Sequence, residues 1–415
     1  MKKLILSIAL LGSLSLSYAQ DEPERKAPLY AANNVNTSMV AAVQGADPQN
    51  DDPMRSKNFS KTFPLGSGDK ISLHNQYGGM VIKLWDKKEI KIDVSVKAFS
   101  NDEREVQKLI DQVTISAEKN GDMVGCKTII EQPGNRSGRG RRREIKVNYV
   151  VYMPSSNALT LTQEFGNVNL EGCSGPLYAK VQYGDFIAGN LSGTNNYISV
   201  QYGKTSITEL NKGVVKQQYG SGLTIGTVGT LDLDAQYAPV SINTIRGNAV
   251  IKQQYGSGLT VNSVNNLDLN VQYANVRVDN IKGNAIIRQE YNSLKIGNVG
   301  KLSLRSEYAG VNIGNLRGDG NLKMSYNNLD INEIGSGCKN LLIDNEYVDT
   351  KLNFAGGYNG DFTVKSSYSG FRHGDRVSVS QTGEDDENKN YSGKIGSGGG
   401  AVIRMKSEYG SVSFR

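Results

Sequence analysis

Apolar and polar positions alternate along most of the chain beyond residue 160. Leu231 and Leu233 precede Tyr237 at every second position, and Val240 and Ile242 continue an alternating pattern beyond it. Successive side chains of a β-strand point to opposite faces of a sheet. The pattern therefore predicts short strands that bury one face.

The same pattern returns about every 18 residues. The stretch "KQQYGSGLTIGTVGTLDLDAQYAPVSINTIRGNAVI", which starts at Lys216, is followed directly by a near copy of itself. An aromatic residue marks each repeat: Phe165, Tyr183, Tyr202, Tyr219, Tyr237, Tyr255, Tyr273, Tyr291, Tyr308 and Tyr326, followed at longer intervals by Tyr347, Tyr368 and Tyr409. A unit of this length cannot bury its apolar face alone, so stacked coils are predicted.

Each coil is expected to turn twice. The parity of the apolar positions changes just after the aromatic residue, which predicts a first corner there. A second corner follows the next strand, as in "IRGNA", where Gly247 can supply a positive φ. Because the rings share parity with the preceding leucines, we expect them to point inward or half-inward and to stack as a structural ladder. A carbohydrate-stacking platform is the alternative.

These patterns predict an all-β chain. Residues 161–415 are expected to form a single-stranded parallel β-solenoid with about 18 residues per coil. We favour a right-handed solenoid, because the strict hexapeptide pattern of left-handed β-helices is absent. A polar, glycine-rich segment at 372–400 interrupts the last aromatic interval and is expected to form a loop or hairpin.

Three further segments precede the solenoid. Residues 60–160 are expected to form a β-rich N-terminal cap that covers the end of the solenoid, with one short helix in "SNDEREVQKLIDQV". Residues 20–59 lack periodicity and are expected to be a disordered leader. Residues 1–19 have the lysines, apolar stretch and small residues of a secretory signal peptide cut after Ala19. Export to the periplasm, the outer-membrane surface or the extracellular medium follows.

Several segments together resemble a known family. "ISLHNQYGGMVIKLWDKKEIKIDVSVKAF", the helix, "IKVNYVVYMPSSNALTLTQEFGNVNLEGCSGPL" and the "QYG" coils resemble the adhesin-like β-strand-repeat proteins of bacterial envelopes over about residues 60–415. Most of that family is described only as a domain of unknown function. The resemblance implies a secreted β-solenoid with a surface or adhesion role, and it supplies no catalytic residue.

Composition narrows the choice of partners. The formal net charge is +6, and removal of Lys2 and Lys3 with the signal peptide leaves +4 (6 − 2), too mild to indicate a specific nucleic-acid partner. No later stretch has the length of apolar residues needed for a transmembrane segment. Three widely spaced cysteines do not predict a disulfide framework, although one bridge remains open. Cys173 lies in a core column and is expected to be a buried small hydrophobe.

The sequence favours no catalytic activity and no cofactor. His74 and His373 are the only histidines and lie far apart in the sequence, which disfavours metal sites and histidine-dependent hydrolysis. The alternative is a polysaccharide lyase or glycosidase that uses the outward Asp232, Asp234 and Asp268. We expect instead a structural or interaction protein of the cell envelope, with polysaccharide binding or cleavage as the alternative function.

Two groups of residues are candidates for binding. An outward column precedes the aromatic residues and consists of Gln182, Gln201, Gln218, Gln236, Gln254, Gln272, Glu290 and Glu307. These side chains can hydrogen-bond to one another along the solenoid axis, or they can offer a flat polar face to an envelope glycan or protein. A basic loop, which could contact an anionic envelope component or be a solvated hairpin tip, contains Arg136, Arg139, Arg141, Arg142 and Arg143.

Overall fold

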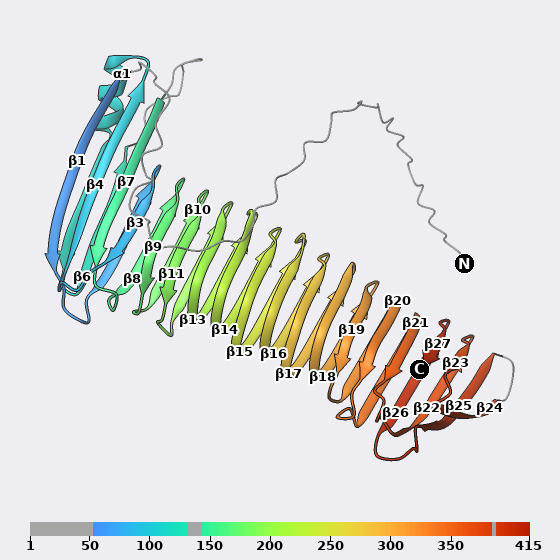
Figure 1. Cartoon of the computed structure of the whole chain (residues 1–415). Coiled ribbons are helices and arrows are strands. Elements are labelled where there is room, and N and C mark those ends of the chain that lie inside the picture. Colours follow the sequence, from blue (N-terminus) through green and yellow to red (C-terminus); the bar gives the residue numbers. More distant parts are fainter. Residues whose placement is uncertain (1–52, 132–142, 384–386) are drawn as a thin grey trace, which may run out of the picture. The chain divides into compact units, whose positions relative to one another are not determined.

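The computed structural model describes residues 53–131, 143–383 and 387–415 (Figure 1). The predicted signal peptide, nearly all of the predicted leader and most of the basic loop lie outside these residues. The described strands confirm the predicted β-solenoid with an N-terminal β-rich cap. They hydrogen-bond into one continuous network with a single helix among the described residues.

Each coil places one strand in each of two rows of parallel strands (Figure 1). In the first coils the strands are separate elements: β8 (Ala158–Glu164), β9 (Val168–Cys173), β10 (Leu177–Gln182), β11 (Phe186–Leu191) and β12 (Asn196–Gln201). Later strands run through the second corner and contribute to both rows: β13 (Lys204–Gln218), β14 (Gly222–Gln236), β15 (Val240–Gln254), β16 (Leu259–Gln272), β17 (Val276–Glu290) and β18 (Ser293–Glu307). β20 (Gly320–Ile334) and β21 (Asn340–Phe354) also contribute to both rows, but they run through the first corner. β19 (Gly310–Leu316) lies in one row only.

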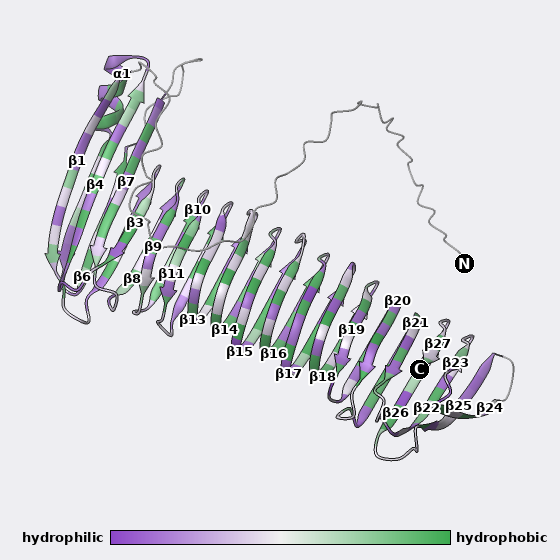
Figure 2. Cartoon of the chain, viewed as in Figure 1, coloured by the Kyte–Doolittle hydropathy of each residue, from purple (hydrophilic) through white to green (hydrophobic). Residues whose placement is uncertain are grey.

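Successive coils lie in register, so equivalent residues form columns. One core column runs through Leu233, Ile251, Leu269, Ile287, Leu304 and Leu322. Each of these side chains is at most 3% exposed. The alternation of apolar and polar residues along the strands is visible in Figure 2. Burial between neighbouring coils therefore supplies the apolar contacts that one coil cannot make by itself.

The N-terminal cap extends both rows beyond the first coil. That coil consists of β2 (Lys70–Gln76) and β3 (Met80–Leu84), which pair with β8 and β9. On their other edge lie β6 (Met123–Ile130) and β7 (Arg143–Met153). β4 (Glu89–Ser100) joins β7 to β1 (Met54–Pro64), and β5 (Val113–Asn120) pairs with β6, all in antiparallel fashion.

The helix α1 (Glu103–Asp111) packs on this cap through the apolar residues that the sequence indicates. Val106, Leu109 and Ile110 are buried, and the Asp102 carboxylate caps the helix by accepting hydrogen bonds from the backbone N–H groups of Arg104 and Glu105. Val113, which we expected on the helix, instead begins β5.

The cap begins earlier in the sequence than predicted. β1 begins at Met54, within the segment 20–59 expected to be a disordered leader. Only Phe63 is buried in β1, so the strand has no apolar alternation that a sequence pattern could reveal. Its lysines complete the cap: the Nζ atoms of Lys57 and Lys61 donate to the backbone carbonyls of Val113 and Ala117 at 2.5 and 2.8 Å.

The last strands are not stacked in the order in which they occur in the sequence. β22 (Gly360–Ser367) and β23 (Phe371–His373) come next after β21, but β26 (Val402–Glu408) and β27 (Val412–Phe414) lie between them and β21. The polar segment at 372–400 contains a hairpin of β24 (Val377–Gly383) and β25 (Asn388–Ile395). β25 also pairs with β22, so the hairpin continues one row of strands.

Candidate functional site

The aromatic column forms an exposed edge of the solenoid. Fourteen rings stack in the order Tyr77, Phe165, Tyr183, Tyr202, Tyr219, Tyr237, Tyr255, Tyr273, Tyr291, Tyr308, Tyr326, Tyr347, Tyr409 and Tyr368. Neighbouring centroids are 4.4 to 5.4 Å apart, from Tyr273–Tyr291 to Tyr202–Tyr219. We call this column the aromatic ladder.

The rings do not point inward, so the expected inward or half-inward placement was wrong. Their side chains are 37% exposed at Tyr291 and 53% exposed at Tyr368, with the others between these values. Every ladder residue has a positive φ, from 49° at Tyr219 to 62° at Tyr291. This left-handed conformation turns the chain at the first corner and breaks the alternation, which places the ring on the outside.

The left-handed conformation is costly for a tyrosine. A residue with a Cβ atom loses about 1–2 kcal/mol in this region, whereas glycine does not. Stacking offsets this cost, because each offset pair of rings contributes about 0.5–1.5 kcal/mol beyond burial. Stacking thus offsets much of the cost of an aromatic residue at each first corner.

Ring stacking also restricts what the ladder can bind. Planes of neighbouring rings are nearly parallel, with an angle of 2° for Tyr183–Tyr202 and 13° for Tyr202–Tyr219. Each ring inside the stack therefore has both faces covered by its neighbours. A sugar ring that stacks on an aromatic face has no free face there, so these inner rings do not form a carbohydrate-stacking platform. Their edges and hydroxyl groups remain accessible.

Close backbone contact favours Gly or Ala after most of the rings, although Asn292, Asn327 and Val348 follow three of them. A Cβ atom on Gly184 would lie 2.0 Å from the carbonyl oxygen of Gly166, and one on Gly203 would lie 1.9 Å from that of Gly184. The second corner works in the same way, contrary to the expectation of a positive φ. Gly247 is absent from the residues with positive φ, and its Cβ atom would lie 2.8 Å from the carbonyl oxygen of Gly229.

The outward column before the rings hydrogen-bonds along the solenoid axis. The Nε2 atom of Gln182 donates to Oε1 of Gln201 at 2.9 Å, and Gln201 donates in the same way to Gln218 at 2.7 Å. A second run leads from Gln254 to Gln272 at 2.8 Å and from Gln272 to the Glu290 carboxylate at 3.0 Å. We call this column the amide ladder.

The amide ladder has one break and one change of charge. The Nε2 atom of Gln236 donates instead to the Asp234 carboxylate at 3.3 Å. Beyond Glu290, the Glu307 carboxylate pairs with Arg305 at 2.8 Å. One part of the outer face is therefore lined by neutral amides and the next part by carboxylates with nearby bases.

A second row of glutamines is buried beside the amide ladder and was missed by the sequence analysis. Gln163, Gln217, Gln253 and Gln289 are at most 1% exposed. The Nε2 atom of Gln217 donates to the carbonyl of Gly203 at 2.8 Å, and its Oε1 accepts from Thr205 at 2.5 Å. These side chains satisfy carbonyl groups at the first corner. The repeated "QQY" was the available signal, because its first glutamine has the parity of the core.

Neighbouring phenols change each other's acidity. Beside the charge that Tyr308 would carry as a phenolate, the pKa of Tyr326 is raised above its ordinary value. A hydrogen bond to Tyr291 likewise raises the pKa of Tyr273. The raised pKa values favour the neutral form of Tyr273 and Tyr326, in which a phenol hydroxyl can donate a hydrogen bond to a partner.

The acidic candidates do not come together as one cluster. Asp232 and Asp268 occupy the same outward column two coils apart, with the exposed Val250 between them. The Asp268 carboxylate pairs with Arg288 at 3.6 Å, and that of Asp234 accepts from Gln236. Among the residues that the structure describes, no group of three or more His, Cys, Asp or Glu side chains could hold a metal ion.

None of the remaining candidates that the structure describes belongs to either ladder. Of the basic loop, Arg136, Arg139, Arg141 and Arg142 lie outside the described residues, while Arg143 forms an ion pair with Glu105 of α1. His373 is exposed and His74 is half-buried. Cys126, Cys173 and Cys338 are buried free thiols, and burial raises the pKa of Cys173 to about 11.

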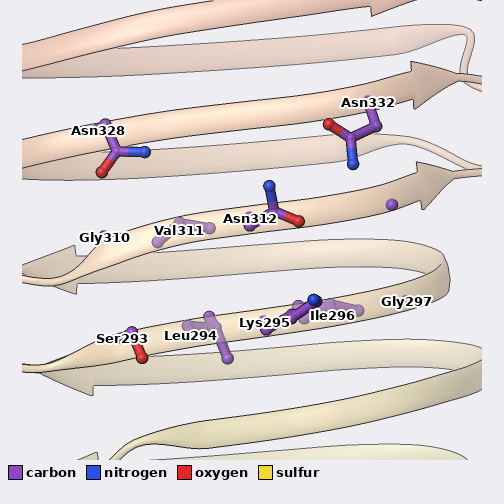
Figure 3. A pocket seen from close by; sticks show the side chains of 11 residues that line it. Ser293, Leu294, Lys295, Ile296, Gly297, Gly310, Val311, Asn312, Asn328 and Asn332 are labelled. Carbon is purple, nitrogen blue, oxygen red and sulfur yellow. The ribbon is translucent and has the colours of Figure 1, made fainter.

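An open depression of about 560 Å³ crosses the outer face of the other row of strands (Figure 3). Asn312, Asn328 and Asn332 line it from β19 and β20, together with Lys295 of β18. Gly297 and Gly314 leave space between these side chains because they carry none themselves. The lining mixes these hydrogen-bonding side chains with the apolar Leu294, Ile296 and Val311.

No protein-family model matches the chain, and no curated protein matches it. Among solved structures it is similar to a candidate cell adhesion protein from Clostridium sporogenes, with 8% identity, a TM-score of 0.17 and coverage of 87% of this chain and 99% of the other. A candidate adhesin from Bacteroides fragilis has 6% identity, a TM-score of 0.18 and coverage of 86% and 97%.

A candidate lipid-binding protein from Parabacteroides distasonis has 10% identity, a TM-score of 0.20 and coverage of 86% and 96%. Scores this low do not establish a shared activity, and the fold rests on the strand pairing of the chain itself. In the three described stretches of the chain, no helix has the length and apolar character needed to cross a membrane.

Proposed function

We propose that this chain is a secreted, envelope-associated interaction protein with an adhesin-like role and no catalytic activity. The observation that carries the proposal is the continuous exposed edge formed by the aromatic and amide ladders. It presents an aromatic ring and a neighbouring amide or carboxylate at each coil, about 4.8 Å apart. Contiguous exposed aromatic side chains on a protein surface often mark an interaction site.

A repeated edge suits an extended partner. An extended envelope polysaccharide or protein segment that follows the solenoid axis meets similar hydrogen-bonding groups at every coil. Each contact is weak, but joined contacts add up because the second and later ones are intramolecular. The accessible hydroxyl groups of the tyrosines and the free hydrogen-bonding positions of the glutamines supply these contacts.

Binding to isolated envelopes and to a glycan array tests this proposal. The test variant is Gln201→Ala/Gln218→Ala, which removes two hydrogen-bonded members of the amide ladder. The control is Ser206→Ala/Thr224→Ala, which changes two paired outward residues on the other row of strands. Loss of binding in the test variant alone supports the proposal. Equal binding by both variants and the unchanged chain would show that the amide ladder does not bind the partner.

The same glycan panel tests the alternative of polysaccharide cleavage. Release of reducing ends or unsaturated products, lost in Asp232→Ala and Asp268→Ala, would replace the proposed role by an enzymatic one. We expect binding without turnover, because the Asp268 carboxylate is already held by Arg288.

A further inference from the structure

The coil formed by β26 and β27, which we call the inserted coil, interrupts the order of the solenoid. Ile403 pairs with Leu341 of β21 on one side and with Phe362 of β22 on the other. In the ladder, the Tyr409 ring lies 4.7 Å from Tyr347 and 5.0 Å from Tyr368. Two coils that are consecutive in the sequence are thus separated by a third that comes later.

The inserted coil is held by the same kinds of contact as the other inner coils, namely buried apolar side chains and backbone hydrogen bonds. Ile403, Met405, Val412 and Phe414 are at most 3% exposed. β26 hydrogen-bonds to β21 and β22 along its whole length, and β27 pairs with β21 and β23. All of these partners lie in segments that are distant in sequence, so nothing in these contacts requires the coil to come from the same molecule.

Without the inserted coil, β22 could also pair directly with β21. Leu341 and Phe362 occupy equivalent positions, because both pair with Ile403, and Ile343 and Val364 are equivalent because both pair with Met405. β22 could therefore stack directly on β21 with apolar side chains over apolar side chains. The match is incomplete in the other row, where Thr350 would meet Phe371 and Leu352 would meet His373.

The connection to the inserted coil is suited to movement. Four glycines lie between β25 and β26, and Gly396, Gly398, Gly399 and Gly400 all have positive φ, between 62° and 79°. A Cβ atom on Gly399 would meet nothing within 4 Å. Glycines lose more conformational freedom on folding than other residues, so release of this connection is favoured by entropy.

We propose that the inserted coil exchanges between copies of this chain, so that β26 and β27 of one molecule occupy the gap between β21 and β22 of a second. The partner is a second copy because only its gap has the two matching edges and core columns. Exchanged and unexchanged molecules make the same contacts outside the glycine connection, so concentration sets the balance between them. Such exchange would join two ladders and present them to one surface.

Capture of a labelled peptide by the full chain tests this exchange. The peptide has the sequence of residues 399–415, and the matched control peptide carries Ile403→Asp and Met405→Asp. Each is incubated with the full chain and then separated by size. We expect saturable capture of the first peptide, at least about tenfold above the control, because unpaired buried charges disfavour insertion.

A disulfide that can be formed and reduced provides a second test of the exchange. The Oγ atoms of Ser369 and Ser407 lie 3.4 Å apart, so Ser369→Cys/Ser407→Cys can form a disulfide that ties the inserted coil in place. Oxidation of this variant should abolish capture, and reduction should restore it.

Equal capture of the two peptides overturns the proposal, as does capture that is unchanged by the disulfide. No capture by a chain without the disulfide and with intact near-ultraviolet circular dichroism also overturns it. These results leave the ladder-binding proposal untouched, because glycan and envelope binding are measured separately.

Discussion

Tyr409 stacks on Tyr347 at 4.7 Å, although Tyr368 is the next ladder residue after Tyr347 in the sequence. The contact shows that column position, and not order along the chain, decides which rings meet. Each coil places an aromatic residue in the left-handed conformation at its first corner, and stacking on the ring of the next coil offsets the cost of that conformation. The same principle sets the expected effect of changes in the ladder.

Substitution of Tyr237 should separate backbone strain from stacking. Its ring lies 4.8 and 5.1 Å from those of Tyr219 and Tyr255, and its φ is 53°. Tyr237→Ala should destabilise the chain by about 1–3 kcal/mol, because two stacking contacts are lost. Tyr237→Gly should be about 1 kcal/mol less harmful than Ala, since glycine removes the left-handed strain.

Urea denaturation followed by circular dichroism measures this order, with Tyr237→Phe as the control. Phe165 already occupies the same column, so Phe should change the midpoint little. If the Tyr237→Ala variant were as stable as the Tyr237→Gly variant, the left-handed conformation would not carry the strain that we describe.

The buried glutamines should matter more to stability than the outward ones beside them. Gln217→Met removes a donor to the Gly203 carbonyl and an acceptor for Thr205, and leaves both groups buried. We expect a loss of about 1–3 kcal/mol, because an unsatisfied buried polar group keeps its full desolvation cost. Gln218→Met, the same change on the outward face, is the control and should cost less than about 1 kcal/mol. Equal losses in chemical denaturation would contradict the distinction between the two columns.

Alkaline pH should loosen the ladder. The pKa values of Tyr273 and Tyr326 are raised in the folded chain, so the folded state holds these phenolic protons more tightly than the unfolded state. The resulting stability is complete below the ordinary tyrosine pKa of about 10 and is lost as pH rises through the raised values.

The midpoint of urea unfolding should therefore stay nearly constant from pH 8 to about pH 10 and fall as the pH rises further. The unfolding midpoint of the double variant Tyr273→Phe/Tyr326→Phe should fall less, because phenylalanine rings cannot ionise. An equal fall for both chains would show that these phenols do not contribute.

The three thiols should be unreactive in the folded chain. Burial raises the pKa of Cys126 to about 11 and that of Cys338 to about 12, and each thiol is at most 2% exposed. Alkylation by iodoacetamide at pH 8 should modify none of them within the time that modifies all three in denaturant, because the thiolate is the reacting species. Mass spectrometry of the intact chain gives the count. Modification of one thiol under native conditions would indicate local opening at its coil.

The sequence predicts the coils well because the same apolar pattern recurs in successive repeats. Leu233, Ile251 and Leu269 recur in one register, and the structure stacks them as one column. The orientation of the rings was not predictable in the same way, since a change of parity at Tyr237 is compatible with several corner conformations. Only the positive φ explains why a residue with core parity lies outside.

The order of the last coils was also beyond a sequence pattern. The interval from Tyr347 to Tyr368 is close to one repeat, so direct stacking is the natural expectation. Whether another coil enters between them depends on contacts between distant segments, such as that of Leu341 with Ile403. The candidate binding face was found from its glutamine column, but the hydrogen bonds between its members and the accessible ring edges needed coordinates.

Distances between spin labels along one outward column test the stacked coils most directly. Counting the paired strands from Ser199, Lys406 lies nine coils away and Lys365 ten. At about 4.8 Å per coil, labels at Ser199→Cys and Lys406→Cys should be about 43 Å apart, and those at Ser199→Cys and Lys365→Cys about 48 Å. Double electron–electron resonance that finds residue 406 nearer than residue 365 agrees with the account. The reverse order, or distances that do not grow with the number of coils, would contradict it.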